Sequence, residues 1–161
     1  SEVLTLVFGE AWWIIVFGQL LVFLVVIAVQ RNFKQSIIMF IPLVAGMAMT
    51  FGLFALFDFK ITFFNVVCIT ALMGMGVDGG IHYINRWLYN NKDVQIVQNE
   101  LFEPLYSAFF TVIFGYAGMI FSQHSGLRSM GILSALGMTL IMIANLALLP
   151  GLLKIYSKLK K

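Results

Sequence analysis

The chain has 161 residues, of which 61% are hydrophobic and only 11% are charged, and its mean hydropathy is +0.97. Soluble domains carry about a quarter charged residues, and a chain this short cannot bury so much apolar surface in water, so the composition excludes a soluble fold. The net charge of +3 does not indicate a nucleic-acid partner, because four of the ten basic residues lie in the last eight positions, directly after a long apolar run.

Five long apolar stretches follow one another along the chain, and each is at or near the length of about 20 residues that a helix needs to cross the hydrocarbon core. They cover about 11–29, 36–57, 61–83, 104–121 and 129–153. Strands of a membrane barrel would be about half as long and would alternate apolar with polar residues. The sequence therefore predicts an all-α integral membrane protein, with residues 1–161 forming a single domain that is a five-transmembrane-helix bundle.

The longest connection, 88–103, carries apolar residues at helical spacing, Val94, Val97 and Leu101, with polar residues between them. This pattern predicts a short amphipathic helix at about 92–102 that lies on the cytoplasmic face of the membrane. A solvated connector without a helix is the alternative.

The basic residues predict the orientation, because cytoplasmic segments of membrane proteins are enriched in Lys and Arg. With the amino terminus outside, the cytoplasmic segments hold eight of the ten basic residues: Arg31, Lys34, Arg86, Lys92, Lys154, Lys158, Lys160 and Lys161. Only Lys60 and Arg128 then lie outside. We therefore predict a multi-pass protein of the cell inner membrane with a cytoplasmic carboxyl terminus, Trp12 and Trp13 in an outer aromatic belt, and Trp87 in an inner one. An external amino terminus without a signal sequence also leads us to expect a piece of a longer polypeptide.

Asp78 is the acidic residue of the third predicted span, about two-thirds of the way in from its outer end. A carboxylate at this depth is costly unless it is paired, hydrated or protonated, and such residues mark proton relays and transport pathways. The alternative is an always-neutral Asp78 that hydrogen-bonds a neighbouring helix and only holds the bundle together.

Three further residues are candidates for proton translocation beside Asp78. His82 follows it by four residues and lies on the same face of a helix, although a histidine here can also sit among the lipid headgroups. Thr111 in the fourth span and Asn145 in the fifth are polar groups that we expect within hydrogen-bond reach of Asp78. Both can instead satisfy local backbone carbonyls.

Four glycines surround the acid: Gly74, Gly76, Gly79 and Gly80. A glycine inside a helix costs close to 1 kcal/mol relative to alanine, so we expect neighbouring backbones or water to come close to this helix. Small residues also make ordinary contacts between membrane helices, and Gly76 and Gly80 have the spacing for them.

Enzymatic and cofactor-dependent functions lack support in the sequence. His82 and His124 are predicted toward opposite membrane faces, so no metal is expected, and no Gly-Lys-Ser/Thr loop for a nucleotide is present. An intramembrane aspartyl protease needs two carboxylates that share a proton, and the other acidic residues lie in loops or near helix ends. We expect no cofactor and no catalytic residue.

The segment 74–86, Gly-Met-Gly-Val-Asp-Gly-Gly-Ile-His-Tyr-Ile-Asn-Arg, resembles the GxxxD motif in the fourth or tenth helix of RND-superfamily permeases. The likeness is greatest to the MMPL and hopanoid-exporter-like branch, which is akin to sterol-sensing-domain proteins. The stretches 121–131, 133–137 and 149–150 are similar to the last two helices of a half in that branch.

This resemblance implies an RND-permease-like half, equivalent to helices two to six or eight to twelve of a twelve-helix transporter. It implies that Asp78 takes part in proton-driven export of lipid or other hydrophobic molecules, and that the partners are membrane lipid, a second half or another copy, and an external porter domain on the same polypeptide. The residue after the acid is usually aromatic in the family and is Gly79 here. A non-transporting scaffold or lipid sensor that assembles with partner proteins is therefore the alternative function.

Overall fold

The computed structural model of the chain describes residues 2–30, 32–59, 63–90 and 93–159. They form five α-helices: α1 (Glu2–Gln30), α2 (Phe33–Leu56), α3 (Phe63–Tyr89), α4 (Val94–Met119) and α5 (Ser125–Leu159). The described segments contain no strand. The all-α prediction is confirmed.

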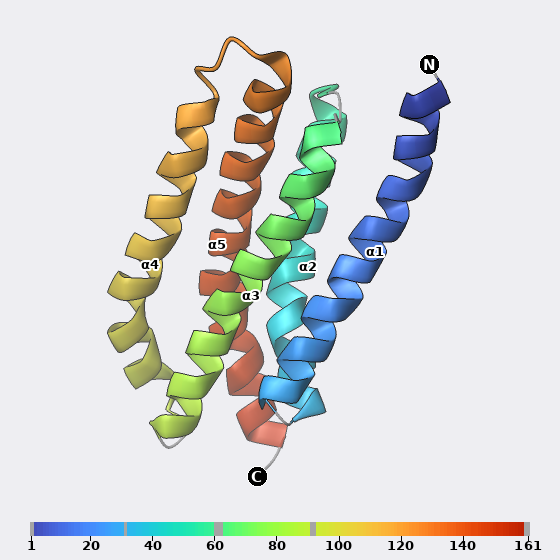
Figure 1. The fold of residues 1–161 in the computed structure, drawn as a ribbon. Coiled ribbons are helices and arrows are strands. Elements are labelled where there is room, and N and C mark those ends of the chain that lie inside the picture. Colours follow the sequence, from blue (N-terminus) through green and yellow to red (C-terminus); the bar gives the residue numbers. More distant parts are fainter. Residues whose placement is uncertain (1, 31, 60–62, 91–92, 160–161) are drawn as a thin grey trace.

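The helices run alternately up and down, so that successive connections lie at opposite ends of the bundle (Figure 1). The α1–α2 and α3–α4 connections lie at the same end as the chain's carboxyl terminus, which we call the carboxyl-terminal end. α5 packs against α2, α3 and α4, whereas α1 contacts only α2 and α3. Of the helix pairs that touch, α3 and α4 contact each other least. The chain is therefore closely packed around α5 and open between α3 and α4.

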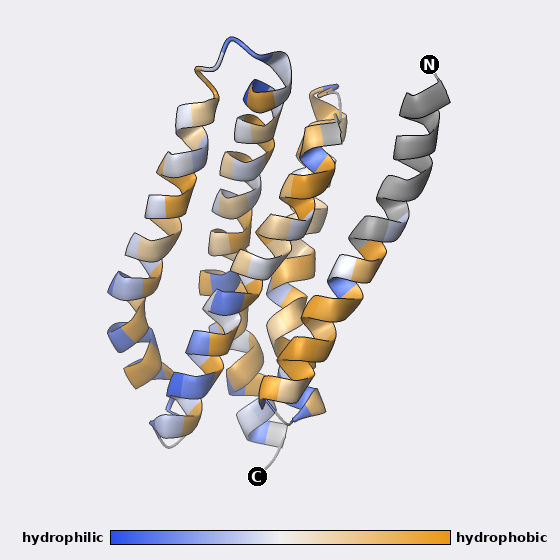
Figure 2. Cartoon of the chain, in the orientation of Figure 1, coloured by the Kyte–Doolittle hydropathy of each residue, from blue (hydrophilic) through white to orange (hydrophobic). Residues whose placement is uncertain are grey.

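Three described helices are long and apolar enough to cross a membrane: Phe33–Leu56, Phe64–Tyr89 and Ser125–Lys158. A shorter apolar segment, Val16–Gln30, belongs to α1. Hydrophobic residues cover most of the length of the helices, and hydrophilic ones gather toward the connections (Figure 2). The chain is a multi-pass membrane protein. The predicted span 104–121 falls in α4, which begins ten residues earlier with polar turns and is not among the three helices named above.

The separate amphipathic helix expected at 92–102 is not present, because these turns are the start of α4, which runs without a break from Val94 to Met119. Asp93 caps this helix: its carboxylate accepts a hydrogen bond from the backbone N–H of Gln95 at 2.8 Å. Val94 and Val97 are buried in the bundle. The apolar face predicted for this segment exists, but it covers the protein's own core.

Trp87 also differs from the prediction, which placed it in an inner interfacial belt. Its side chain is only 1% exposed, and its ring packs against that of Tyr156 with the centroids 6.1 Å apart. Trp87 lies on the side of α3 that faces α5, so it is part of the core. Trp13 is 68% exposed, and the side chain of Trp12 lies outside the described part of the structure.

Glycines allow α2 to approach one face of α3. A Cβ atom added to Gly76 would lie 2.6 Å from Cδ1 of Leu43, and one added to Gly80 would lie 3.3 Å from Cβ of Met39. Gly74 differs, because nothing lies within 4 Å of the corresponding position. Gly74 therefore makes no close helix contact within the described part of this chain.

Candidate functional site

Asp78 lies in a cavity of about 250 Å³ between α3 and α4. Asp78 and His82 line it from α3, Ala108 and Val112 from α4, and Met138 from α5. Both Asp78 and His82 are exposed. Their spacing of four residues places them one above the other on a single face of the helix, as the helical period requires. The cavity follows from the sparse contact between α3 and α4.

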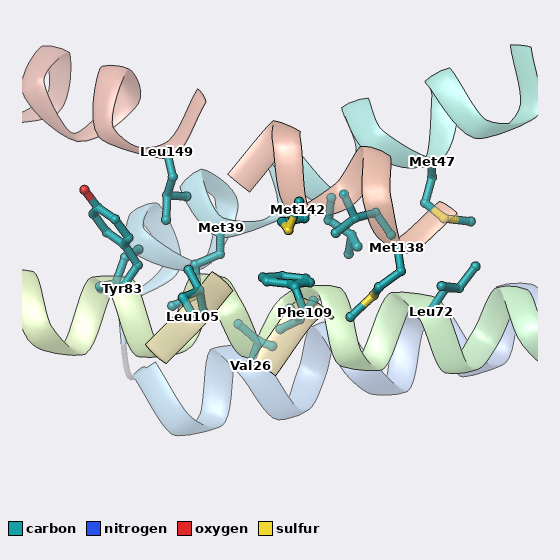
Figure 3. Close-up of a cluster of buried hydrophobic side chains, with 14 of the residues drawn as sticks. Val26, Met39, Met47, Leu72, Tyr83, Leu105, Phe109, Met138, Met142 and Leu149 are labelled. Carbon is teal, nitrogen blue, oxygen red and sulfur yellow. The ribbon is translucent and has the colours of Figure 1, made fainter. Parts of the chain in front are cut away.

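Phe109 of α4 forms the wall of this cavity next to the acid. A Cβ atom at Gly79 would lie 3.1 Å from the Phe109 ring, so the absence of a side chain at Gly79 leaves room for the ring. Figure 3 shows Phe109 within the cluster of buried side chains that Met39, Met138 and Met142 also join. The space left by Gly79, the residue after Asp78, is thus filled by an aromatic ring from α4.

Asn145 is buried at 1% exposure and ties α5 to α3. Its side-chain Nδ2 donates a hydrogen bond of 3.2 Å to the backbone carbonyl of Gly76. Its Oδ1 is buried and has no hydrogen-bond partner among the residues that the structure describes. Asn145 of α5 therefore contacts the backbone of α3 in the turn next to Asp78, and it makes no hydrogen bond to the carboxylate.

Thr111 does not line the cavity. Its hydroxyl donates a hydrogen bond of 2.9 Å to the carbonyl of Ser107 in its own helix, and its side chain is exposed. A step of one residue turns a helix by about 100°, so Val112 faces α3 while Thr111 faces away. The expected hydrogen bond between Asp78 and Thr111 or Asn145 is absent, and no other described residue hydrogen-bonds this carboxylate.

A second cavity, of about 480 Å³, adjoins the first at the carboxyl-terminal end. His82 lines both cavities, and Asn85, Arg86 and Glu100 contribute to the second. His82 is therefore the side chain at which the two spaces meet. The sequence indicates that His82 and Asp78 share a face, but it gives no sign of the two cavities that adjoin them.

An ion pair spans the second cavity from α3 to α4. Nε of Arg86 donates a hydrogen bond of 2.6 Å to Oε2 of Glu100, and Nδ2 of Asn90 donates to the same oxygen at 2.8 Å. These bonds, first that of Arg86 and then that of Asn90, hold the pKa of Glu100 below its usual range. The Arg86 guanidinium also lies over the ring of Tyr89, 5.4 Å from its centroid. Sequence reasoning missed this network, although opposite charges on successive helices were a signal for it.

The described residues contain no group of three or more His, Cys, Asp and Glu side chains close enough to hold a metal ion. His124 lies beside Phe64, with the ring centroids 5.9 Å apart, near the start of α5 and far along the bundle from His82. The groups in the first cavity that can exchange a proton are the carboxyl group of Asp78 and the imidazole of His82.

Two known proteins are similar to this chain. It is 27% identical over 123 residues to the hopanoid transporter HpnN of Rhodopseudomonas palustris (strain TIE-1), an alignment that covers 76% of this chain and 14% of HpnN. It is 22% identical over 145 residues to the protein named "Putative membrane protein MJ1562" of Methanocaldococcus jannaschii, an alignment that covers 86% of this chain and 37% of that protein.

The chain spans only a small part of the length of both relatives, so the similarity concerns one part of each. No protein-family model matches the chain, and no solved structure does. The similarity to HpnN supports an RND-like membrane protein and agrees with the resemblance found in the residues around Asp78.

Proposed function

We propose that the chain is the transmembrane half of a proton-coupled transporter of the RND/MMPL type, which exports lipid or other hydrophobic molecules, and that Asp78 is its proton carrier. The observation that carries the proposal is an exposed carboxyl group in a cavity of a membrane-spanning helix. The similarity to a hopanoid transporter supports the lipid-like substrate class.

The contacts around α3 favour a proton carrier over an acid that only stabilises the bundle. A stabilising Asp78 would be hydrogen-bonded to a neighbouring helix. In this chain Asn145 makes such a bond, to the backbone of Gly76. The Asp78 carboxyl group faces open space together with His82. It is therefore free to exchange a proton with water or with the imidazole.

His82 is the next group of the proposed relay. Four residues along a helix correspond to a rise of about 6 Å, a gap that one water molecule can bridge. Imidazole can accept a proton on one nitrogen and release one from the other. Because His82 lines both cavities, it connects Asp78 with the carboxyl-terminal end of the bundle.

The open side of α3 also indicates a partner. An acid facing lipid is costly, so the surface formed by α3 and α4 around Asp78 has to be covered in the membrane. We propose that a second RND half or a second copy of the chain covers it, while membrane lipid surrounds the rest. An external porter domain on the same polypeptide belongs to this proposal, and a nucleic-acid partner does not.

The proposed orientation has the carboxyl-terminal end in the cytoplasm of a cell with this protein in its inner membrane. Four described basic residues, Lys34, Arg86, Lys154 and Lys158, lie on segments at this end, and Arg128 lies at the other. The remaining basic residues, Arg31, Lys60, Lys92, Lys160 and Lys161, lie outside the described residues. The positive-inside rule then predicts an external amino terminus.

One observation favours the alternative function, a membrane scaffold or lipid sensor that does not transport. The expected relay partners Thr111 and Asn145 bond to backbone carbonyls, and not to Asp78. A relay confined to this chain would consist of Asp78, His82 and water alone. A sensor needs no relay, and its cavity would serve to hold a lipid.

The variant Asp78→Asn separates these functions. Asparagine has nearly the same shape and can hydrogen-bond, but it cannot take up and release a proton at physiological pH. We expect the variant to assemble normally in membranes and to lose export driven by a proton gradient in vesicles. Full export by an assembled Asp78→Asn protein would contradict proton coupling through this residue and favour the scaffold.

A further inference from the structure

The ion pair of Arg86 and Glu100 lies where the second cavity meets the carboxyl-terminal end of the bundle. Arg86 lies near the end of α3 and Glu100 near the start of α4, and both line the cavity that His82 also lines. The pair therefore bridges the two helices across the space that leads toward Asp78. Among the residues with described side chains, it is the one Arg or Lys paired with an acidic group.

α4, which carries Glu100, lacks one backbone hydrogen bond directly after this residue. Pro104 lies inside α4 and has no backbone N–H, so the carbonyl of Glu100, four residues earlier, lacks its normal helical donor. Prolines are the usual cause of a bend in a helix, and the first turns of α4 point toward the end of α3 (Figure 1). The missing bond makes this segment easier to displace than a regular helix.

The same segment is fixed to the bundle by two buried valines. Val94 and Val97 are 5% and 0% exposed, whereas Glu100 is exposed. A small rotation about these two valines would separate Glu100 from Arg86 without detaching α4. The first three turns of α4 thus contain two buried valines, a backbone hydrogen bond missing at Pro104, and Glu100, whose ion pair with Arg86 can break.

From these features we infer that the Arg86–Glu100 pair is a gate that controls the access of water from the carboxyl-terminal end to the cavity of Asp78. The closed gate has the two side chains joined, and the open gate has Glu100 displaced on the first turns of α4. The role of this gate in transport rests on the function proposed above, but the gate itself is a property of the cavities and can be tested without transport.

The strength of the pair suits a gate that opens in every cycle. The side chains of Arg86 and Glu100 are 46% and 38% exposed, so water screens their attraction. Exposed ion pairs shift an equilibrium by only about two- to fivefold.

The test measures the accessibility of the Asp78 cavity in the intact protein in membrane vesicles. In a background with Cys68→Ala, the variant Ala108→Cys places a thiol in this cavity, and a charged, membrane-impermeant thiosulfonate is added on either side. We expect Glu100→Ala to raise the modification rate about two- to fivefold, with reagent on the side where α3 ends. The exchanged pair Arg86→Glu with Glu100→Arg should return the rate to that of the parent.

Salt supplies a second measurement on the parent itself, which does not depend on the folding of a Glu100 variant. About 1 M salt reduces the screening length to about 3 Å, so it should raise the rate in the parent and leave the Glu100→Ala rate unchanged. Thr111→Cys, on the face of α4 away from the cavity, is the matched control and should stay unreactive throughout.

Equal rates in the parent and Glu100→Ala, or no rescue by the exchanged pair, would overturn the gate. If Glu100→Ala behaves as expected and Asp78→Asn still exports fully, the gate stands and the proposed proton coupling fails.

Discussion

The two sides of α3 meet their neighbours in opposite ways. On one side, α2 and α5 come close: a Cβ atom at Gly76 would lie 2.6 Å from Leu43 and 2.9 Å from Ile141, and Asn145 adds a hydrogen bond to the backbone. On the other side, α4 stands away, and two cavities separate it from Asp78 and His82. The buried Asn145 on the packed side holds two helices together, whereas Asp78 and His82 on the open side have no hydrogen-bond partner among the described residues. We conclude that the first side stabilises the fold, and the second is the side to which the proposed proton transfer belongs.

Close packing of this kind extends to the contact between α2 and α5. A Cβ atom at Gly46 would lie 2.7 Å from the Cα atom of Ile141. The neighbour is backbone, which cannot rotate out of the way as a side chain can. Because packed interiors do not tolerate added volume, this contact is the most sensitive test of the packed side.

The largest effect on stability is expected for Gly46→Ala. The added methyl group forces α2 and α5 apart and should lower the free energy of unfolding by about 1–3 kcal/mol, measured by thermal or denaturant unfolding in detergent. Gly52→Ala is the matched control in the same helix, because nothing lies within 4 Å of a Cβ there. It should be neutral or slightly stabilising, since alanine favours a helix over glycine by about 1 kcal/mol or less. Equal effects of both substitutions would refute the close contact.

On the open side, His82→Gln should reduce proton-driven export by about tenfold or more, because glutamine cannot pass on a proton and water has to bridge the gap. Thr111→Val is its control, since Thr111 faces away from the cavity, and it should keep full export. Both variants should unfold like the parent. Loss of export in Thr111→Val with normal export in His82→Gln would reverse our assignment of the cavity-facing residues.

A smaller effect on stability is expected for Asn145→Ala. It removes the hydrogen bond to Gly76, and such bonds between membrane helices average about 0.6 kcal/mol and reach about 1.7. Thr139→Val is the control, because the Thr139 hydroxyl bonds only the carbonyl of Ala135 in its own helix. If Asn145→Ala unfolds like Thr139→Val but loses export, Asn145 acts in the relay after all.

Hydropathy and length were sufficient to predict the helices because both are local properties of the chain. The start of α4 was misjudged for a physical reason. The predicted span begins at residue 104, at Pro104. A proline removes only one helical hydrogen bond, however, and the Asp93 cap together with the burial of Val97 keeps the preceding turns helical. Local sequence does not report such tertiary support.

The same limit applies to the site. The shared face of Asp78 and His82 follows from the helical period, which the sequence contains. The choice between Thr111 and Val112 as the residue facing α3 does not, because most of α4 past Pro104 is apolar all round and gives no sign of its inward face. The contact of Phe109 with the space left by Gly79 likewise depends on how α4 packs in three dimensions.

The central claim is that Asp78 changes its protonation state on the open side of α3. Dicyclohexylcarbodiimide is an apolar reagent that reacts with protonated carboxyl groups. It tests the claim directly when its attachment to Asp78 in membranes is followed by mass spectrometry over a series of pH values. We predict attachment at acidic pH that declines steadily as the buffer becomes alkaline and that is absent in Asp78→Asn. Attachment that does not change with pH would show an always-neutral Asp78, and no attachment at any pH would show one that never takes up a proton. Either result would contradict the account.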